Sequence, residues 1–357
     1  MRVKLKDVCE KATSKLKQSD ILSLGGKYPV FGASGYLGNM DSYHQDKPYI
    51  AVVKDGAGIG RTTILPPKSS VIGTMQYLIP KENVMPEYLY YVVKHMRLQK
   101  YYTGATIPHI YFKDYQNEEF NLADSIRQRE IVKVLKNVED TIRYQEIEIN
   151  KFDELIKARF IEMFGDPVSD TKNWGQTQLK EHLESIKYGT STPPIFTDNG
   201  YAFIRATNIK NGKIVTNDMK YIPQEEADRL EKCKLSGGEI IIVRSGVNAG
   251  DTCVVTDEYI GQYAGYDMIL VLSRDLHPVF FNTLINTEYM DKVVKPLTRR
   301  AAQPHLNSEQ TQRLPIIQVP FELQNQFADF VQQVDKSREE VKKSLEKTQQ
   351  LYDSLMQ

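Results

Sequence analysis

The chain has 357 residues, which is enough for two or three domains. Its hydrophobic fraction of 41% and charged fraction of 26% are typical of a folded protein in water, and we find no apolar stretch long enough for a membrane span and no signal peptide. Basic and acidic residues balance at 46 each, so any basic surface must be local. Three widely separated cysteines argue against a disulfide framework and predict a cytoplasmic location.

The first 124 residues predict a β-rich block. Residues 1–7 are expected to begin with a strand, residues 49–53 read as a buried strand, and residues 86–99 predict a helix. The segment from Gly56 to Thr62, GAGIGRT, predicts a turn between two strands in which glycines supply positive φ angles.

A long helix is predicted over residues 125–166. Asp124 or Ser125 can cap its first turn, and Gly165 followed by Pro167 ends it. Its apolar seam is spaced by threes, fours and sevens and comprises Ile131, Leu135, Val138, Ile142, Ile149, Phe152, Ile156 and Met163. The other faces are polar, so this narrow stripe predicts a coiled-coil partner.

A second block and a second helix follow in the same order. Residues 167–320 predict another β-rich block, with buried strands at 239–244 and 268–272 and a helix at 278–292. Residues 321–357 predict a long helix whose seam comprises Phe327, Val331, Val334, Val341, Leu345, Tyr352 and Leu355. Because a whole block separates the two helices along the chain, we expect them to pair with each other in antiparallel orientation.

The two halves of the chain are an internal repeat. Pro108-His109 recurs as Pro304-His305, and Gln128 recurs as Gln324, each at an offset of 304 − 108 = 324 − 128 = 196 residues. Upstream the offset is shorter, so the blocks drift while the helices keep register. The sequence therefore predicts an α+β fold: two β-rich domains, 1–124 and 167–320, separated by two long antiparallel coiled-coil helices, 125–166 and 321–357, with a pseudo-twofold axis.

This order of elements resembles the specificity subunits of type I restriction–modification systems over essentially the whole chain. The most specific stretch is residues 159–167, RFIEMFGDP, followed by Trp174 and Leu179, and the duplicated Pro-His and Gln junctions add to it. The resemblance implies that each block is a target recognition domain reading one half of a bipartite, asymmetric DNA site. It also implies that the coiled coil sets the spacing between the halves and docks the methyltransferase subunits.

The same resemblance implies partners and an absence of chemistry. The partners would be double-stranded DNA, two modification (methyltransferase) subunits and restriction (motor-nuclease) subunits, with no membrane. This chain would be non-catalytic and would hold no cofactor, whereas S-adenosylmethionine, ATP and magnesium would serve the partner subunits. We see no methyltransferase, helicase or nuclease motif in the sequence.

Candidate DNA contacts come from the turns, the Pro-His segments and two polar strand ends. Arginine can read guanine, glutamine can read adenine, and cations or hydroxyls can hold phosphates. The candidates are Lys54, Arg61 and Arg244 at the turns, Thr106, His109, Arg299, Arg300, Gln303 and His305 around the Pro-His steps, and Ser34, Arg205, Thr207 and Asn208 at the strand ends. Each has a structural alternative, such as a solvated cation. For the histidines we favour the alternative, a hydrogen bond to the junction loop.

Two rival functions remain. A nucleotide-binding enzyme would use the glycine-rich turns, but a phosphate-binding loop needs four residues between its glycines and then Lys-Ser/Thr. Only three residues separate Gly56 from Gly60, Arg61 follows, and the second copy has Asp251 there. A coiled-coil adaptor that binds proteins would explain the helices but not why the blocks differ so much. Neither histidine lies in a cluster with metal-ligand spacing, so no metal site is predicted.

Overall fold

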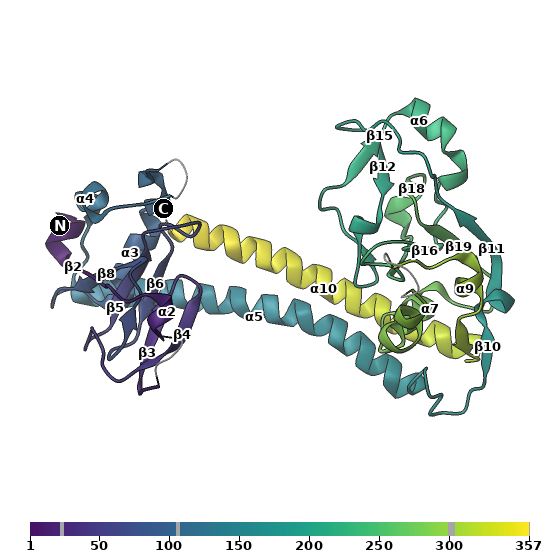
Figure 1. Ribbon diagram of the computed structural model, residues 1–357, viewed down its shortest axis with the longest axis horizontal. Helices are drawn as coiled ribbons and strands as arrows, with labels where there is room; N and C mark the ends of the chain where they lie inside the picture. Colours follow the sequence, from purple (N-terminus) through teal and green to yellow (C-terminus); the bar gives the residue numbers. More distant parts are fainter. Residues whose placement is uncertain (22–24, 105–107, 299–303, 357) are drawn as a thin grey trace. The chain divides into compact units, whose positions relative to one another are not determined.

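The computed structural model describes residues 1–21, 25–104, 108–298 and 304–356. These residues form two compact units: unit 1 comprises residues 1–146 and 343–357, and unit 2 comprises residues 147–342 (Figure 1). Each unit combines strands, short helices and a part of each of two long helices. Within the described ranges, no helix has the length and apolarity that a membrane crossing requires.

Unit 1 is built on a four-stranded antiparallel sheet of order β2-β8-β5-β6, joined by a three-stranded sheet β4-β3-β7 and a pair β1-β9. Every residue of β5 is buried, as its continuous apolar run predicts. The elements are β1 (Arg2–Lys4), α1 (Leu5–Val8), β2 (Cys9–Thr13), α2 (Gln18–Ile21), β3 (Tyr28–Gly32), β4 (Gly35–Met40), β5 (Tyr49–Val53), β6 (Thr62–Leu65), β7 (Ser70–Val71), β8 (Met75–Pro80), α3 (Pro86–His95), η1 (Leu98–Tyr101), α4 (Phe112–Tyr115) and β9 (Glu119–Asn121).

Unit 2 repeats this plan with a four-stranded antiparallel sheet β11-β19-β16-β17, a three-stranded sheet β15-β12-β18 and a pair β10-β20. It adds the two-stranded hairpin β13-β14. Its strands are β10 (Gln176–Gln178), β11 (Leu183–Tyr188), β12 (Tyr201–Ile204), β13 (Ile209–Lys210), β14 (Lys213–Ile214), β15 (Lys220–Ile222), β16 (Ile240–Ile242), β17 (Thr252–Val254), β18 (Tyr263–Ala264), β19 (Met268–Leu272) and β20 (Pro315–Ile317).

The helical turns of unit 2 lie between these strands, and Figure 1 shows α6 beside β15 at the top of this unit. They are η2 (Leu179–His182), η3 (Ala206–Asn208), α6 (Gln224–Arg229), η4 (Glu231–Cys233), η5 (Asp257–Tyr259), α7 (Pro278–Ile285), the π-helix η6 (Met290–Val294), α8 (Lys295–Thr298) and α9 (Ser308–Gln312).

The repeat is therefore present in the strand order as well as in the sequence. In each unit the three-stranded sheet contains one parallel pair, β3 with β7 in unit 1 and β12 with β18 in unit 2. The fold class predicted from the sequence, two β-rich domains with long helices, is confirmed. The expected helices at 86–99 and 278–292 are shorter than predicted, because Arg97 adopts a left-handed φ of 50° after α3 and a π-helix interrupts the chain after α7.

Two long helices, α5 (Ser125–Phe164) and α10 (Phe321–Leu355), each contribute to both units. Asp124 is the N-cap of α5, since its carboxylate accepts hydrogen bonds from the amides of Ile126 (3.0 Å) and Arg127 (2.9 Å). The helix stops at Phe164, where Gly165 takes a left-handed φ of 77°.

The helices run antiparallel within each unit. In unit 1, Glu139 accepts from the Tyr352 hydroxyl (2.7 Å) and Gln145 donates to Ser344 (2.8 Å), so residue numbers rise on one helix as they fall on the other. In unit 2, Asp153 accepts from the guanidinium of Arg338. At the end of this pairing, an aromatic cluster buries Phe160, Phe164 and Phe327, with ring centroids 5.0–5.5 Å apart.

Every predicted seam residue except Leu355 is buried or half-buried. Leu135, Ile156, Phe327, Val331, Val334 and Tyr352 are buried. Leu355, the last residue of α10, is 44% exposed. Phe160 and Phe164 are fully buried although the heptad pattern does not include them, since they face the core of unit 2.

A buried glutamine at the start of each long helix fastens the globular part of its unit. The Gln128 side chain accepts from the Met85 amide (2.9 Å) and donates to the carbonyls of Asn83 (3.0 Å) and Ala123 (2.9 Å). In unit 2, the Gln324 side chain accepts from the His277 amide (2.8 Å) and donates to the carbonyls of Asp275 (3.1 Å) and Val319 (2.8 Å). A glutamine amide supplies both donors and acceptor, so one side chain satisfies three backbone groups.

Candidate functional site

The glycine-rich turns have the same construction in both units. Each turn joins the strand that ends at Val53 (β5) or Ile242 (β16) to the next strand of the four-stranded sheet. Gly56, Gly60, Gly246 and Gly250 all have positive φ angles, between 79° and 99°, as the sequence predicts. A side chain at Gly60 would approach the Gln99 amide within 2.6 Å, so this glycine is also required by close packing.

The Pro-His segment of each unit is hydrogen-bonded to its turn. In unit 1, the Gly56 amide donates to the Pro108 carbonyl (3.0 Å) and the Ile110 amide donates to the Lys54 carbonyl (2.9 Å). In unit 2, the corresponding bonds run from Gly246 to Pro304 (3.1 Å) and from Leu306 to Arg244 (2.8 Å). Two segments far apart in the sequence thus form one composite surface element in each unit, which we call the turn–histidine element (residues 54–61 with 108–110, and 244–251 with 304–306).

The histidine side chains lock this element. His109 Nδ1 lies 2.7 Å from Asp55 Oδ1, and His305 Nδ1 lies 2.8 Å from the Ser245 hydroxyl. The sequence favoured a hydrogen bond from each histidine to its own junction loop. Each histidine does form an internal hydrogen bond, but its partner lies in the glycine-rich turn. Burial tends to raise the pKa of Asp55, but the hydrogen bonds from Lys54 and His109 outweigh it and leave that pKa below its usual value.

The cations at the turn differ in their surroundings. Lys54 forms an ion pair with the neighbouring Asp55 (2.8 Å), so its charge is compensated within the turn. Arg244 instead places its guanidinium 5.0 Å from the centroid of the Tyr188 ring. Tyr188 stands at the end of β11, and its hydroxyl accepts from the Ser308 amide (2.9 Å).

Apart from Asn208, the other sequence candidates fall into three groups. Ser34, Arg61 and Thr207 are exposed, and Arg61 donates to the Ala33 carbonyl (3.0 Å), which joins the first turn to the β3–β4 hairpin. Arg205 binds the Asp218 carboxylate (3.0 Å) and carbonyl. Thr106, Arg299, Arg300 and Gln303 lie outside the described residues.

The prediction of Asn208 as a contact residue is corrected by the burial of its side chain. Its side chain is fully buried, donates to the carbonyls of Val215 and Asn217 (both 3.1 Å) and accepts from the Arg205 amide (3.2 Å). All of its hydrogen-bonding groups are therefore used inside unit 2, and an external ligand has no access to it. Asn208 fixes the loop that carries Thr207 and is removed from the candidate contacts.

Sequence reasoning missed several exposed side chains at the turn–histidine elements. In unit 1, Tyr111 is 48% exposed, its ring stacks against His109 with an interplanar angle of 20°, and Tyr102 is 61% exposed nearby in sequence. In unit 2, Val247 is 93% exposed at the tip of the turn. The high tyrosine count was the only sequence signal for such residues, whereas the pairing of Tyr188 with Arg244 depends on a long-range contact.

The backbone of the turns argues against a nucleotide site. A phosphate-binding loop directs a run of free amides at its ligand. Here the amides of Gly56, Ile59, Gly60 and Arg61 donate to carbonyls of the protein, and Gly246, Ala249, Gly250 and Asp251 do the same in unit 2. In the part of the chain that the structure describes, no group of three or more His, Cys, Asp or Glu side chains is placed to hold a metal ion.

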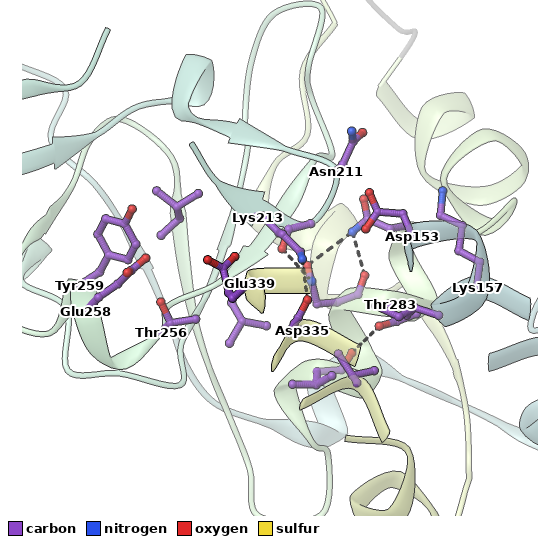
Figure 2. A pocket seen from close by; sticks show the side chains of 18 of the residues that line it. Asp153, Lys157, Asn211, Lys213, Thr256, Glu258, Tyr259, Thr283, Asp335 and Glu339 are labelled. Carbon is purple, nitrogen blue, oxygen red and sulfur yellow. Dashed lines mark hydrogen bonds and ion pairs between the residues drawn. The ribbon is translucent and has the colours of Figure 1, made fainter. Parts of the chain in front are cut away.

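A cavity of about 490 Å³ lies in unit 2 between hairpin β13–β14, α7 and the parts of α5 and α10 that belong to this unit (Figure 2). Lys213 of the hairpin forms an ion pair with Asp335 of α10 (2.8 Å), and Asn282 of α7 donates to the Gly212 carbonyl (3.0 Å). These contacts hold the hairpin against α7 and α10. The cavity is thus part of the attachment between the globular part of unit 2 and its helices.

The comparisons with known proteins agree on one family. Residues 1–152 and 171–350 match the family model described as type I restriction modification DNA specificity domain. The type I restriction enzyme MjaVIII specificity subunit of Methanocaldococcus jannaschii is 22% identical over 331 residues, which cover 85% of this chain and 77% of that protein. A putative MjaX specificity subunit from the same organism is 25% identical over 189 residues, or 49% of this chain and 42% of that protein.

Solved structures show the same fold. The S subunit of a type I restriction–modification system from M. genitalium superposes with a TM-score of 0.62 at 14% identity, covering all of this chain and 94% of that chain. A chain from a structural study of complex assembly and conformational transition in the type I R-M system gives a TM-score of 0.61 at 14% identity, covering all of this chain and 96% of that chain. At such low identity the likeness concerns the fold alone.

Proposed function

Because this chain belongs to the type I restriction–modification DNA specificity family, with two such domains in tandem and a role in DNA sequence specificity, we propose a reading site in each unit. On this proposal, each unit reads one half of a bipartite, asymmetric DNA site through its turn–histidine element. The observation that carries this proposal is the duplicated turn–histidine element, whose backbone bonds match in both units while its side chains differ. A shared backbone with different side chains suits two readers of two different sequences.

The chemistry of the elements supports contact with DNA. Half or more of the hydrogen bonds between proteins and DNA go to phosphate and sugar, and the rest read base edges. Each element combines a cation at the start of a turn, an exposed turn tip and a histidine fixed beside them. We assign contacts to Lys54, Arg61, His109, Arg244 and His305 at these elements, and to Ser34, Arg205 and Thr207 at the neighbouring strand ends. Thr106, Arg299, Arg300 and Gln303 remain candidates from the sequence.

The long helices are proposed to set the spacing between the half-sites and to dock two modification subunits. On this proposal the recognition domains comprise residues 1–124 and 167–320, and the conserved helices comprise residues 125–166 and 321–357. The antiparallel contacts of α5 with α10 in each unit support a scaffold of paired helices. The chain itself would be non-catalytic, with S-adenosylmethionine, ATP and magnesium bound by the modification and restriction subunits in the cytoplasm.

The test is to map DNA methylation across the genome of the host by long-read sequencing, with the gene intact, deleted and restored on a plasmid. We expect the deletion to remove one bipartite motif that carries methylated adenine in both halves, and the plasmid to restore it. A methylome that is unchanged by the deletion, in cells where the intact gene is expressed together with its modification subunit, would contradict the proposal. It would favour the protein-binding adaptor instead.

A further inference from the structure

We propose that Arg244 reads a guanine in the half-site of unit 2, with its guanidinium held over the ring of Tyr188. This inference rests on the proposed function, because it names the base that one residue of the turn–histidine element recognises. It assigns a specificity-determining role to Arg244, where a contact to a phosphate would only add affinity. It gives no such role to Lys54, the residue at the matching position of unit 1.

The backbone of Arg244 is fixed on both sides. Its amide donates to Oδ1 of Asp267 (3.0 Å), a carboxylate that is only 3% exposed, and its carbonyl accepts from the Leu306 amide (2.8 Å). Val243, the preceding residue, is completely buried in the core of unit 2. The point from which the arginine side chain leaves the backbone is therefore set by the fold before any DNA is bound.

The side chain is also arranged in advance. The guanidinium lies 5.0 Å from the centroid of the Tyr188 ring, and the Tyr188 hydroxyl is itself held by the Ser308 amide (2.9 Å). The attraction between a guanidinium and the face of an aromatic ring uses none of the N–H donors in hydrogen bonds, so these donors stay available. Within the described ranges of the chain, no side-chain hydrogen bond or ion pair is formed by Arg244. A planar fork with free edge donors matches the O6 and N7 acceptors of guanine in the major groove.

The tip of the turn favours bases over phosphates as its neighbours. Val247, three residues after Arg244, is 93% exposed. An apolar side chain gains nothing beside a charged phosphate, but it can contact the methyl group of a thymine or the face of a base. An arginine and an exposed valine on one short turn are therefore suited to contact base edges in a DNA groove.

The comparison with unit 1 limits the proposal to unit 2. Lys54 is bound to Asp55 at 2.8 Å, and Asp55 also binds His109. In unit 2 the residue after the cation is Ser245, which carries no charge, and this serine binds His305 instead. The exchange of aspartate for serine removes the ion-pair partner inside the turn, whereas Lys54 is paired directly with Asp55. The charge nearest to Arg244 is then the buried Asp267 carboxylate, which attracts the guanidinium without forming an ion pair with its edge donors in the described part of the chain.

The experiment compares wild type with Arg244→Lys in the complete complex, by mapping methylated motifs on a library of duplexes with randomised half-sites. Lysine keeps the charge but loses the planar fork, so we expect the preference for guanine at one position of the second half-site to fall about 10-fold or more, while the first half-site stays unchanged. Arg274→Lys is the matched control, since Arg274 is exposed in the same unit and lies away from the turn. It should leave every position unchanged.

A second measurement uses the wild-type complex and does not depend on how a variant folds. Replacing each guanine of the second half-site in turn by 7-deazaguanine removes the N7 acceptor, and we expect one such position to lose about 10-fold in binding. The proposal is overturned if no position responds, or if Arg244→Lys keeps the full guanine preference while Arg244→Gln only flattens the salt dependence, as a phosphate contact would. Failure of the proposed function itself would appear separately, as the absence of any bipartite motif with the wild-type protein.

Discussion

Among single residues, the clearest difference between the two units is the side chain that holds the histidine after the proline. The histidine after the proline must be held against the turn, and its Nδ1 finds the Asp55 carboxylate in unit 1 and the Ser245 hydroxyl in unit 2. Both partners lie at the same distance within 0.1 Å, but only aspartate brings a charge. Asp55 therefore pairs with the adjacent Lys54 inside the turn, whereas Ser245 brings no charge to Arg244, whose nearby carboxylate is the buried Asp267.

Glu139 of α5 provides a prediction about pH. Burial tends to raise its pKa, but donors from Lys94, Tyr352 and Tyr91 outweigh burial and leave the pKa below its usual value. A lowered pKa contributes stability above the unfolded-state value near 4.3, and this contribution is lost as pH falls through the folded-state value. We expect Glu139→Gln to lower the free energy of unfolding by about 1–2 kcal/mol at pH 7, and this difference should shrink progressively as pH falls below the unfolded-state pKa and through the lower folded-state pKa.

Urea denaturation of both proteins at several pH values checks this, since the difference between them removes the titration of all other groups. Glu130→Gln on the same helix is the control, because Glu130 makes an ion pair with Arg127 in which both side chains are more than half exposed. Such pairs contribute little to stability. A Glu139→Gln effect that is equally large at acid pH would show that the lost interaction does not depend on the charge.

At the scale of elements, the end of α5 explains why the stretch RFIEMFGDP and the tryptophan after it occur together. The last turn of a helix leaves carbonyl groups without partners. Lys172 donates to the carbonyls of Glu162 (2.6 Å) and Met163 (3.0 Å), and the indole of Trp174 donates to the carbonyl of Phe164 (3.0 Å). The single tryptophan of the chain is thus a cap for the long helix, and it fixes how the chain leaves α5 toward the strands of unit 2.

The buried glutamines predict a large effect on stability. Gln324→Leu keeps the side-chain volume roughly constant but leaves one amide and two carbonyls without partners in a buried site, so we expect a loss of about 2–4 kcal/mol. Gln332→Leu, at an exposed position of the same helix, should change the free energy of unfolding by less than about 0.5 kcal/mol.

Thermal or urea unfolding gives the overall loss for the two leucine variants. Amide hydrogen exchange locates the loss, and the deprotected amides should include His277, whose partner is Gln324 Oε1. An unchanged stability in Gln324→Leu would mean that solvent replaces the glutamine at little cost, and the fastening role would be withdrawn.

At the scale of the whole molecule, the repeat predicts that the helices determine the spacing of the half-sites. In unit 1, Glu139 faces Tyr352 and Gln145 faces Ser344, so a heptad inserted after Asp140 needs a matching heptad after Gln349 to keep the seam paired. Each helix would gain about 10 Å. We expect the unspecified gap of the methylated motif to lengthen by about three base pairs, with both half-sites unchanged.

Methylation mapping of cells that carry the lengthened chain reads the gap directly. A gap of the original length, in a protein with the expected gain in helix content by circular dichroism, would contradict a role of the helices in spacing. Loss of the motif together with normal folding would show that the docking of the modification subunits requires the original helix length.

The repeat, the fold class and the elements with strong local signals could be predicted from the order of residues alone. The caps of α5, the buried strand β5 and the positive φ angles of the turn glycines all follow from residues close together in the chain, because capping, strand periodicity and glycine backbone freedom are local effects. The equivalence of the two helix starts could also be predicted, because Gln128 and Gln324 recur at a fixed offset. In the structure, both glutamines make the same kind of hydrogen bonds to the backbone of their own units.

Long-range contacts determine which candidate residues share a surface and which form all their hydrogen bonds inside the protein. Asn208 looks like any polar strand end until its three internal hydrogen bonds are known, and Arg244 looks like Lys54 until the Tyr188 ring and the Asp55 carboxylate are placed beside them. These pairings join residues from separate strands and loops. No local pattern encodes them, because burial and partner choice are set by how the sheets pack and not by the neighbours in sequence.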